Sequence, residues 1–129
     1  MELDYVTEGT ACSILTAREH YEDGSSIFVS NCDQHIEWDV EHAESIIGNP
    51  YNSGMIPNFH CPGRNPKWSY ALVDDRQNIK RVAEKDPISE WATVGYYWWR
   101  DGTQFIESAE RMIQANDRVN NEFYTCPVF

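Results

Sequence analysis

The most informative segment of the chain is an apolar run followed by a polar cluster, Ser26-Ile27-Phe28-Val29-Ser30-Asn31-Cys32-Asp33-Gln34-His35. The β-branched and aromatic residues of its first half predict a buried strand. The strand stops in Asn-Cys-Asp, a polar cluster that ends in a carboxylate. Ligands of open α/β sheets bind just beyond the carboxyl ends of strands. Asp33 is therefore a candidate residue of a metal or phosphate site.

The residues around this stretch predict helices and further strands. Apolar residues recur near the 3.6-residue period of a helix at residues 10–21, 40–47 and 101–115. Runs rich in β-branched and aromatic residues predict strands at residues 55–60, 68–73, 79–85, 92–99 and 122–129. The turn at residues 74–78 is typical of a hairpin, whereas the helix after the opening strand is typical of a crossover connection. The pattern predicts an α/β sheet with one antiparallel part, in a single domain of residues 1–129.

Composition and charge narrow the classes of function. A hydrophobic content of 41% and a charged content of 24% are typical of an ordinary globular protein. The formal net charge of -11 argues against a nucleic-acid backbone or an anionic membrane as the main partner. The four cysteines form no C-x-x-C pair, so no zinc site with short spacing is visible.

The acidic first residues lack the features of a signal peptide, and no apolar run approaches the ~20 residues that span a bilayer. The sequence predicts a soluble, cytoplasmic protein.

A set of short motifs occurs in a recognisable order: Gly9-Thr10-Ala11, Ser30-Asn31-Cys32-Asp33, Lys67-Trp68-Ser69-Tyr70, Ala83-Glu84-Lys85, Ala92-Thr93-Val94-Gly95-Tyr96-Tyr97 and Asn121-Glu122-Phe123-Tyr124. From about residue 7 to residue 129 the chain resembles sugar-phosphate nucleotidyltransferases, especially the branch that serves capsular and lipopolysaccharide sugar synthesis. The resemblance implies a Rossmann-like mixed sheet of the nucleotide-diphosphosugar transferase type, which is a GT-A-like fold. It also implies a Mg²⁺-assisted reaction of a nucleoside triphosphate with a sugar 1-phosphate, which releases pyrophosphate.

The resemblance assigns substrate-binding roles to five residues. Gly9 and Thr10 would lie against the nucleobase or its sugar, where a bare glycine backbone permits close approach. Glu84 would accept hydrogen bonds from sugar hydroxyls, and Lys85 would neutralise the sugar phosphate. Gly95 would let the strand backbone approach the sugar. The partners implied are therefore a nucleotide and a sugar phosphate.

Asp33 matches the family position that holds Mg²⁺, a hard cation that prefers carboxylate oxygens. The segment Asp33-Gln34-His35 also echoes the D-x-H metal motif of GT-A glycosyltransferases. Transfer of a sugar from a nucleotide-sugar is therefore an alternative function. A binding or assembly module that keeps the fold without catalysis is a further alternative.

The chain departs from the family pattern in two places. Family members begin with a strand and a G-x-G-x-R loop that holds the triphosphate, whereas Gly9 and Gly24 are the only glycines before the opening strand here. The position of a second acidic metal ligand reads Thr125-Cys126-Pro127. We expect an internal fragment of a nucleotidyltransferase, incomplete on its N-terminal side and inactive alone, because phosphoryl transfer depends on positioning and charge neutralisation. We also expect an exposed sheet edge that forms a homo-oligomer.

Overall fold

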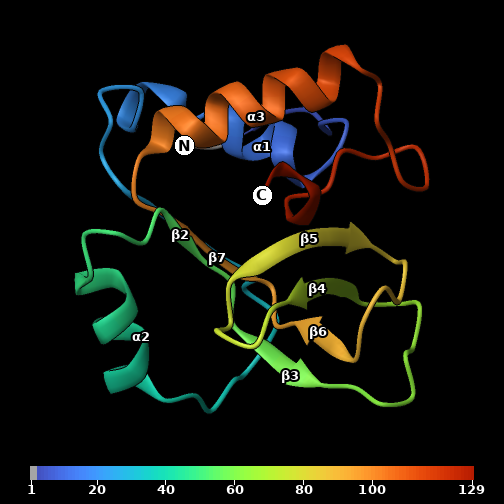
Figure 1. Cartoon of the computed structure of the whole chain (residues 1–129). Helices are drawn as coiled ribbons and strands as arrows, with labels where there is room; N and C mark the ends of the chain where they lie inside the picture. The colour runs from blue at the N-terminus through green and yellow to red at the C-terminus, as the bar shows by residue number, and fades with distance from the viewer. Residues whose placement is uncertain (1–2) are drawn as a thin grey trace.

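Two small antiparallel sheets form the centre of the computed structural model, which describes residues 3–129 (Figure 1). The first sheet has the strand order β1-β7-β2, with bounds Ile27–Ser30, Tyr96–Trp99 and Gly54–Met55. The second has the order β3-β6-β4-β5, with bounds Asn58–His60, Trp91–Thr93, Ser69–Val73 and Ile79–Glu84. The predicted α/β class and hairpin are confirmed. All strand pairs among residues 3–129 are antiparallel, so the parallel pairs of a Rossmann-like sheet are not seen there.

Two of the predicted strands are each divided between the two sheets. The run at residues 55–60 breaks at Pro57 into β2 and β3, because proline has no N–H for the ladder. The run at residues 92–99 breaks at Gly95 into β6 and β7, where the glycine adopts a φ of 77° that side chains disfavour. The breaks lie side by side, since the Val94 N–H donates to the Pro57 carbonyl at 3.1 Å. Both strands therefore change sheet together.

The helices lie on opposite sides of the first sheet. The helices α1 (Thr10–Leu15) and α3 (Gly102–Gln114) cover one side, and α2 (Val40–Gly48) lies on the other (Figure 1). The predicted helix at residues 10–21 ends early and continues as the 3₁₀ helix η1 (Arg18–His20). Asp39 and Asp101 cap α2 and α3 by accepting hydrogen bonds from the backbone N–H groups of His42 and Thr103, each at 2.9 Å. Within residues 3–129 no helix combines the length and apolar character needed to cross a membrane.

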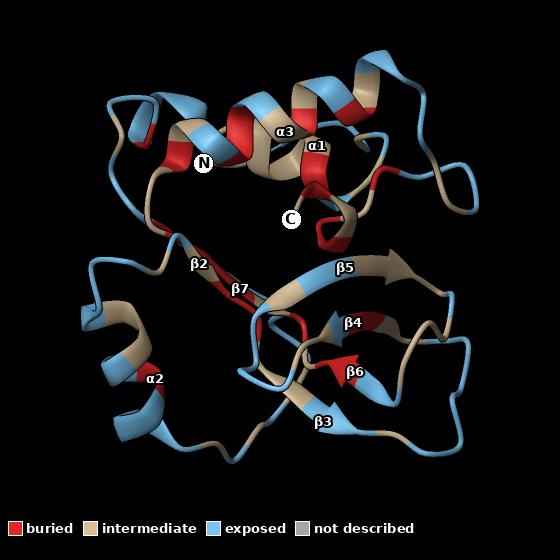
Figure 2. Cartoon of the chain, viewed as in Figure 1, coloured by how far each residue is buried: buried red, intermediate tan, exposed pale blue. Residues whose placement is uncertain are grey.

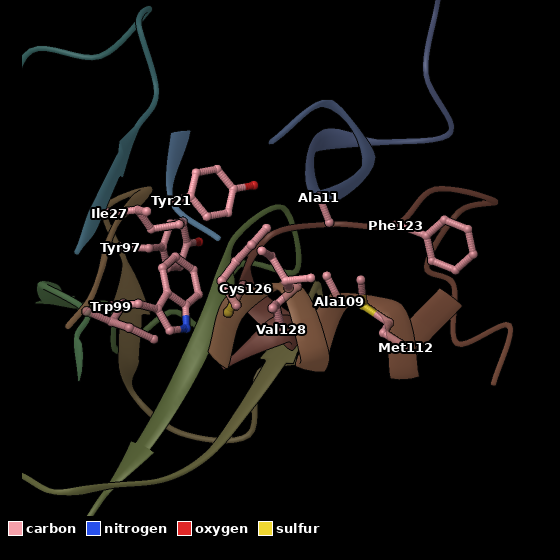
Figure 3. Close-up of a cluster of buried hydrophobic side chains, with 13 residues drawn as sticks. Ala11, Tyr21, Ile27, Tyr97, Trp99, Ala109, Met112, Phe123, Cys126 and Val128 are labelled. Carbon is pink, nitrogen blue, oxygen red and sulfur yellow. The ribbon is translucent and has the colours of Figure 1, made fainter. Parts of the chain in front are cut away.

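Most of the buried side chains lie between α1, α3 and the sheets, whereas α2 is largely exposed (Figure 2). Strand residues alternate between the two faces of a sheet. Tyr97 and Trp99 of β7 therefore point into a cluster of 13 buried residues on the α1 and α3 side (Figure 3). Trp98 points the other way, into a cluster with Ala43 and Met55 beneath α2. We call these the large core and the small core.

The C-terminal segment is not the strand predicted at residues 122–129. It forms an isolated bridge between Val119 and Glu122 and then the 3₁₀ helix η2 (Cys126–Val128). Pro127 removes a ladder N–H and favours helical backbone at this point. Three apolar residues of the segment, Phe123, Cys126 and Val128, are nevertheless buried and belong to the large core.

Candidate functional site

The carboxylate of Glu84 lies at the end of β5, where the β4–β5 hairpin places it opposite Ser69. The Ser69 hydroxyl donates a hydrogen bond to Glu84 Oε2 at 2.5 Å. Glu84 is half-buried, and this burial raises its pKa, opposed by the hydrogen bond from Ser69 and the charge of Lys85. In such low-dielectric surroundings a hydrogen bond to a ligand hydroxyl is stronger than in water. The carboxylate is thus a suitable acceptor for a polyhydroxylated ligand.

Lys85 directly follows β5 and has an unusual backbone conformation, with a φ of 54°. Its backbone N–H donates to the Trp68 carbonyl at 3.1 Å, which ties the conformation to the neighbouring strand. Its Nζ donates to the Tyr124 hydroxyl at 2.5 Å and lies 4.4 Å from the centre of that ring. The Tyr124 hydroxyl is the main cause of the raised pKa of Lys85, and the charges of Glu84 and Glu122 add to it. Positive φ in a residue other than glycine persists only where the surroundings hold it, and it clusters at functional sites.

Neutral hydroxyl and thiol groups lie behind Glu84. The hydroxyls of Thr93 and Tyr97 share a hydrogen bond of 3.2 Å, and both residues are buried. Burial, together with the negative charge of Glu84, raises the pKa of the Cys126 thiol to about 12. Burial also raises the pKa of the Tyr97 hydroxyl well above its usual range. Both groups stay protonated near neutral pH, so Glu84 is the ionisable acid of this cluster.

Gly9 and Thr10 contact the same C-terminal segment that supplies Tyr124. Gly9 has a φ of 135°, and a Cβ there would clash with the Phe123 carbonyl oxygen. The Thr125 hydroxyl donates to the Thr10 hydroxyl at 2.9 Å. Internal packing alone therefore requires a glycine at position 9, and its role beside a nucleobase stays a prediction. Residues 122–126 connect Gly9 and Thr10 with the site at the end of β5.

Gly95 lies instead beside the loop that follows β1. Its carbonyl accepts a hydrogen bond from the Asn31 N–H at 3.1 Å, and a Cβ on Gly95 would clash with Asn31 Nδ2. The same Cβ would lie 3.1 Å from Gln34 Oε1, a buried oxygen without a hydrogen-bond partner among the described residues. Gln34 thus turns inward toward Gly95, whereas Asp33 and His35 are exposed.

Asp33 lies beyond the end of β1, as predicted, and its side chain is exposed. Residues 3–129 contain no cluster of three or more His, Cys, Asp or Glu residues that could hold a metal ion. Magnesium is often held by one or two carboxylates together with substrate phosphates and water. Asp33 could supply one such ligand, so the chemistry of this position fits a shared ion rather than an all-protein cage. Metal binding by Asp33 stays a prediction.

A wide groove lies elsewhere on the described chain. Its volume is about 850 Å³, and it runs between α2 and the β4–β5 turn, with Trp38, Ile46, Asp74 and Trp91 among its lining residues. None of the residues predicted from the motifs lines it. We locate the candidate site by the convergence of polar and charged groups at Glu84 and Lys85, because volume alone supplies no chemistry.

Sequence reasoning missed part of this site. A hairpin centred on residues 74–78 places Ser69 across from Ala83, and a register shift between Leu72 and Val73, which the sequence does not reveal, makes Glu84 its partner. Tyr124 and Cys126 could not be assigned to Glu84 and Lys85, since no local pattern predicts where the C-terminal segment runs. Their positions depend on how that segment fills the large core.

Comparison with known proteins supports the fold. No protein-family model matches the chain, and no curated protein sequence matches it. Its structure is similar to that of a nucleoside-diphosphate-sugar pyrophosphorylase from Vibrio cholerae RC9, with a TM-score of 0.72 and 22% sequence identity. The match covers 98% of this chain and 53% of that chain, so this chain spans about half the length of the solved structure. The match shows that this chain shares its fold with part of that protein.

Proposed function

We propose that this chain is the sugar-phosphate-binding part of a sugar-phosphate nucleotidyltransferase, an enzyme that makes a nucleotide-sugar and pyrophosphate from a nucleoside triphosphate and a sugar 1-phosphate. The observation that carries the proposal is the pair at the end of β5, a half-buried carboxylate on Glu84 beside a positively charged Lys85 with positive φ. The fold shared with the pyrophosphorylase from Vibrio cholerae supports the same class.

The chemistry of this pair suits a sugar phosphate. The carboxylate of Glu84 accepts hydrogen bonds from sugar hydroxyls, with Ser69 holding one of its oxygens in place. The ammonium of Lys85 pairs with the phosphate, since charge-assisted hydrogen bonds are the stronger kind. Tyr124, which now accepts from Lys85 Nζ, then lies beside the phosphate. Contact of the Gly95 backbone with the sugar stays a prediction, because Asn31 and Gln34 fill the space beside this glycine.

The nucleotide side of the reaction involves other residues. Gly9 and Thr10 at the start of α1 would bind the nucleoside, and Asp33 would supply one oxygen ligand to Mg²⁺. A bound Mg²⁺ neutralises negative charge on substrate phosphates. The sequence of residues 1–129 contains no G-x-G-x-R loop to hold a triphosphate. We therefore expect this chain alone to bind a sugar phosphate with little or no turnover.

The test of sugar-phosphate binding is calorimetry with a panel of sugar 1-phosphates and the matching free sugars. The sugar 1-phosphate should bind more tightly than its free sugar, and Lys85→Met should weaken binding by about tenfold or more. Lys80→Met is the matched control, because Lys80 lies on β5, the strand that Lys85 follows, but pairs with Asp74 at 2.9 Å. Absence of binding, or equal losses in the two variants, would overturn the assignment.

A pyrophosphate-release assay with triphosphates and sugar 1-phosphates tests the expected inactivity. Robust turnover by this chain would contradict inactivity and would support the enzyme class. Transfer from a nucleotide-sugar with Mn²⁺ and no triphosphate would favour the glycosyltransferase alternative. A chain that binds neither sugar phosphate nor Mg²⁺ would be a module without catalysis.

A further inference from the structure

Tyr124 is partly exposed, but the backbone beside it is fixed by the start of the chain. Its neighbour Phe123 is buried in the large core. The Phe123 N–H donates to the Glu8 carbonyl at 2.9 Å, and the Phe123 carbonyl accepts from the Ala11 N–H at 3.0 Å. A polar group is held in a defined position when packing and hydrogen bonds fix its neighbours. The fold therefore places the Tyr124 hydroxyl beside Lys85.

The Tyr124 hydroxyl still has a proton to donate. It accepts a hydrogen bond from Lys85 Nζ at 2.5 Å, and it donates to no acceptor among residues 3–129. A phenol hydroxyl both donates and accepts, and an ammonium has three N–H donors. The bond to Tyr124 occupies one of the three donors of Lys85. A phenol donor and an ammonium donor thus lie side by side, and both side chains are partly exposed.

The charges around Lys85 show why this lysine needs help to hold a phosphate. The pKa of Lys85 is raised first by its hydrogen bond to Tyr124, and the nearby carboxylates of Glu84 and Glu122 add to the rise. Two carboxylates and one ammonium leave a negative balance, which repels a phosphate. A hydrogen bond to an ionised acceptor is about twice as strong as one between neutral groups. A second donor beside Lys85 would therefore offset part of the repulsion.

We propose that the Tyr124 hydroxyl is a second phosphate-binding group, which donates a hydrogen bond to the same phosphate that pairs with Lys85. This inference rests on the proposed function, because it adds a ligand-binding residue to the same site. The ammonium of Lys85 can keep its bond to Tyr124 and use its other N–H groups for the phosphate. The pair then favours a phosphorylated sugar over the free sugar through two donors rather than one.

Calorimetry with the panel of sugar 1-phosphates tests the role of Tyr124. Tyr124→Phe removes the donor and keeps the ring, so it should weaken binding of the sugar 1-phosphate by about tenfold and leave binding of the free sugar unchanged. Tyr51→Phe is the matched control and should bind as the native chain does, because Tyr51 is 94% exposed and lines the separate groove beside α2. If Tyr124 were only an internal partner of Lys85, its removal would free the ammonium and strengthen binding. Unchanged or tighter binding by Tyr124→Phe would overturn the proposal.

A Lys85→Met background separates direct contact with the phosphate from an effect that acts through Lys85. In this background Tyr124→Phe should still weaken binding of the sugar 1-phosphate, because the hydroxyl itself contacts the phosphate. No further loss in the double variant would make Tyr124 a positioning residue for Lys85 and would overturn the proposed contact.

An NMR titration of the native chain with inorganic phosphate needs neither a sugar nor a variant that must fold. The ring signals of Tyr124 should shift, whereas those of Tyr51 should stay unchanged. A shift at Tyr124 without binding of any sugar 1-phosphate would support the phosphate contact and overturn the sugar-phosphate function. Binding of a sugar 1-phosphate without a shift at Tyr124 would overturn this inference and leave the proposed function intact. A chain that binds neither ligand would overturn both.

Discussion

The two faces of the first sheet differ in how much core they carry. The face toward α1 and α3 has 13 buried residues, and the face toward α2 has three. The groups at Glu84 and Lys85 are held by segments of the large core, whereas Asp33 lies exposed in the loop that leads to α2. A binding group is held in place when packing and hydrogen bonds fix its neighbours. The side chains of Glu84 and Lys85 are therefore more firmly positioned than that of Asp33.

The largest expected contrast concerns two phenylalanines, one on each face. Phe105 of α3 is 0% exposed and packs against Trp99 at a centroid distance of 4.9 Å, whereas Phe28 is 47% exposed. Phe105→Ala should lower the free energy of unfolding by about 4 kcal/mol, because it leaves a cavity in the large core. Phe28→Ala should lower it by about 1 kcal/mol. Urea denaturation measures the free energy of unfolding of both variants. Similar losses of this free energy would show that the two faces are equally packed.

A pair of glycines gives the next contrast. Gly9→Ala places a Cβ against the Phe123 backbone at a φ of 135°, and it should lower the free energy of unfolding by about 3 kcal/mol. Gly48, at the end of α2, has open space where a Cβ would lie. Gly48→Ala should raise stability by up to about 1 kcal/mol, since alanine favours helix. Thermal and urea unfolding check both changes in stability. A Gly9→Ala variant that is as stable as the native chain would contradict the packing of residues 122–126 against Gly9.

The pH dependence of stability tests the environment of Glu84. Burial raises its pKa above the ordinary value of 4.5, so the folded chain binds this proton more tightly than the unfolded chain. Ionisation of this carboxyl therefore lowers the free energy of unfolding as the pH rises from 4.5 through the folded pKa. Glu84→Gln removes that loss and should be more stable than the native chain near neutrality, with the difference shrinking toward low pH.

The measurement for Glu84→Gln is the free energy of unfolding at a series of pH values. Glu107→Gln is the control, because Glu107 is exposed on α3. Its stability should follow the native curve. A Glu84→Gln variant that is less stable than the native chain at neutral pH would show that the ionised carboxylate is stabilised in the fold.

The smallest expected effect belongs to Asp33. Asp33→Ala should change the free energy of unfolding by less than about 0.5 kcal/mol, because the side chain is exposed. Asp39→Ala, in the same loop, should cost about 1 kcal/mol because it removes the cap of α2. Chemical denaturation compares the free energies of unfolding of the two variants. A large loss at Asp33 would show that this loop is more structured than its exposure indicates.

Local patterns predicted much of the secondary structure. The helix expected at residues 40–47 is α2 (Val40–Gly48), and the helix expected at residues 101–115 contains α3 (Gly102–Gln114). Both have an aspartate cap and an apolar stripe, which are signals carried by nearby residues. The divided strands and the C-terminal 3₁₀ helix were missed. Their conformations depend on which sheet or core each segment contacts, and those neighbours are distant in sequence.

The roles of the candidate site residues stay predictions. The motif around Glu84 and Lys85 pointed to these two charged groups, and hairpin register placed Ser69 within one residue of its partner Glu84. Burial of Glu84 and the contact of Lys85 with Tyr124 could not be predicted, because they depend on the path of residues 122–126. Glycine at position 9 was attributed to ligand approach, whereas the structure shows that packing against Phe123 already requires it.

Interactions between residues close together in the chain account for the features that the sequence alone predicts: the helices, the central hairpin, and the strand that ends before Asp33. The negative charge also follows from composition alone. The exposure of Asp33 and the free sheet edge at β1 emerge only in the folded molecule. Folding also brings residues 122–126 against Gly9 and Lys85. Burial, pKa shifts and strand pairing depend on atoms that are far apart in sequence and meet only when the chain is folded.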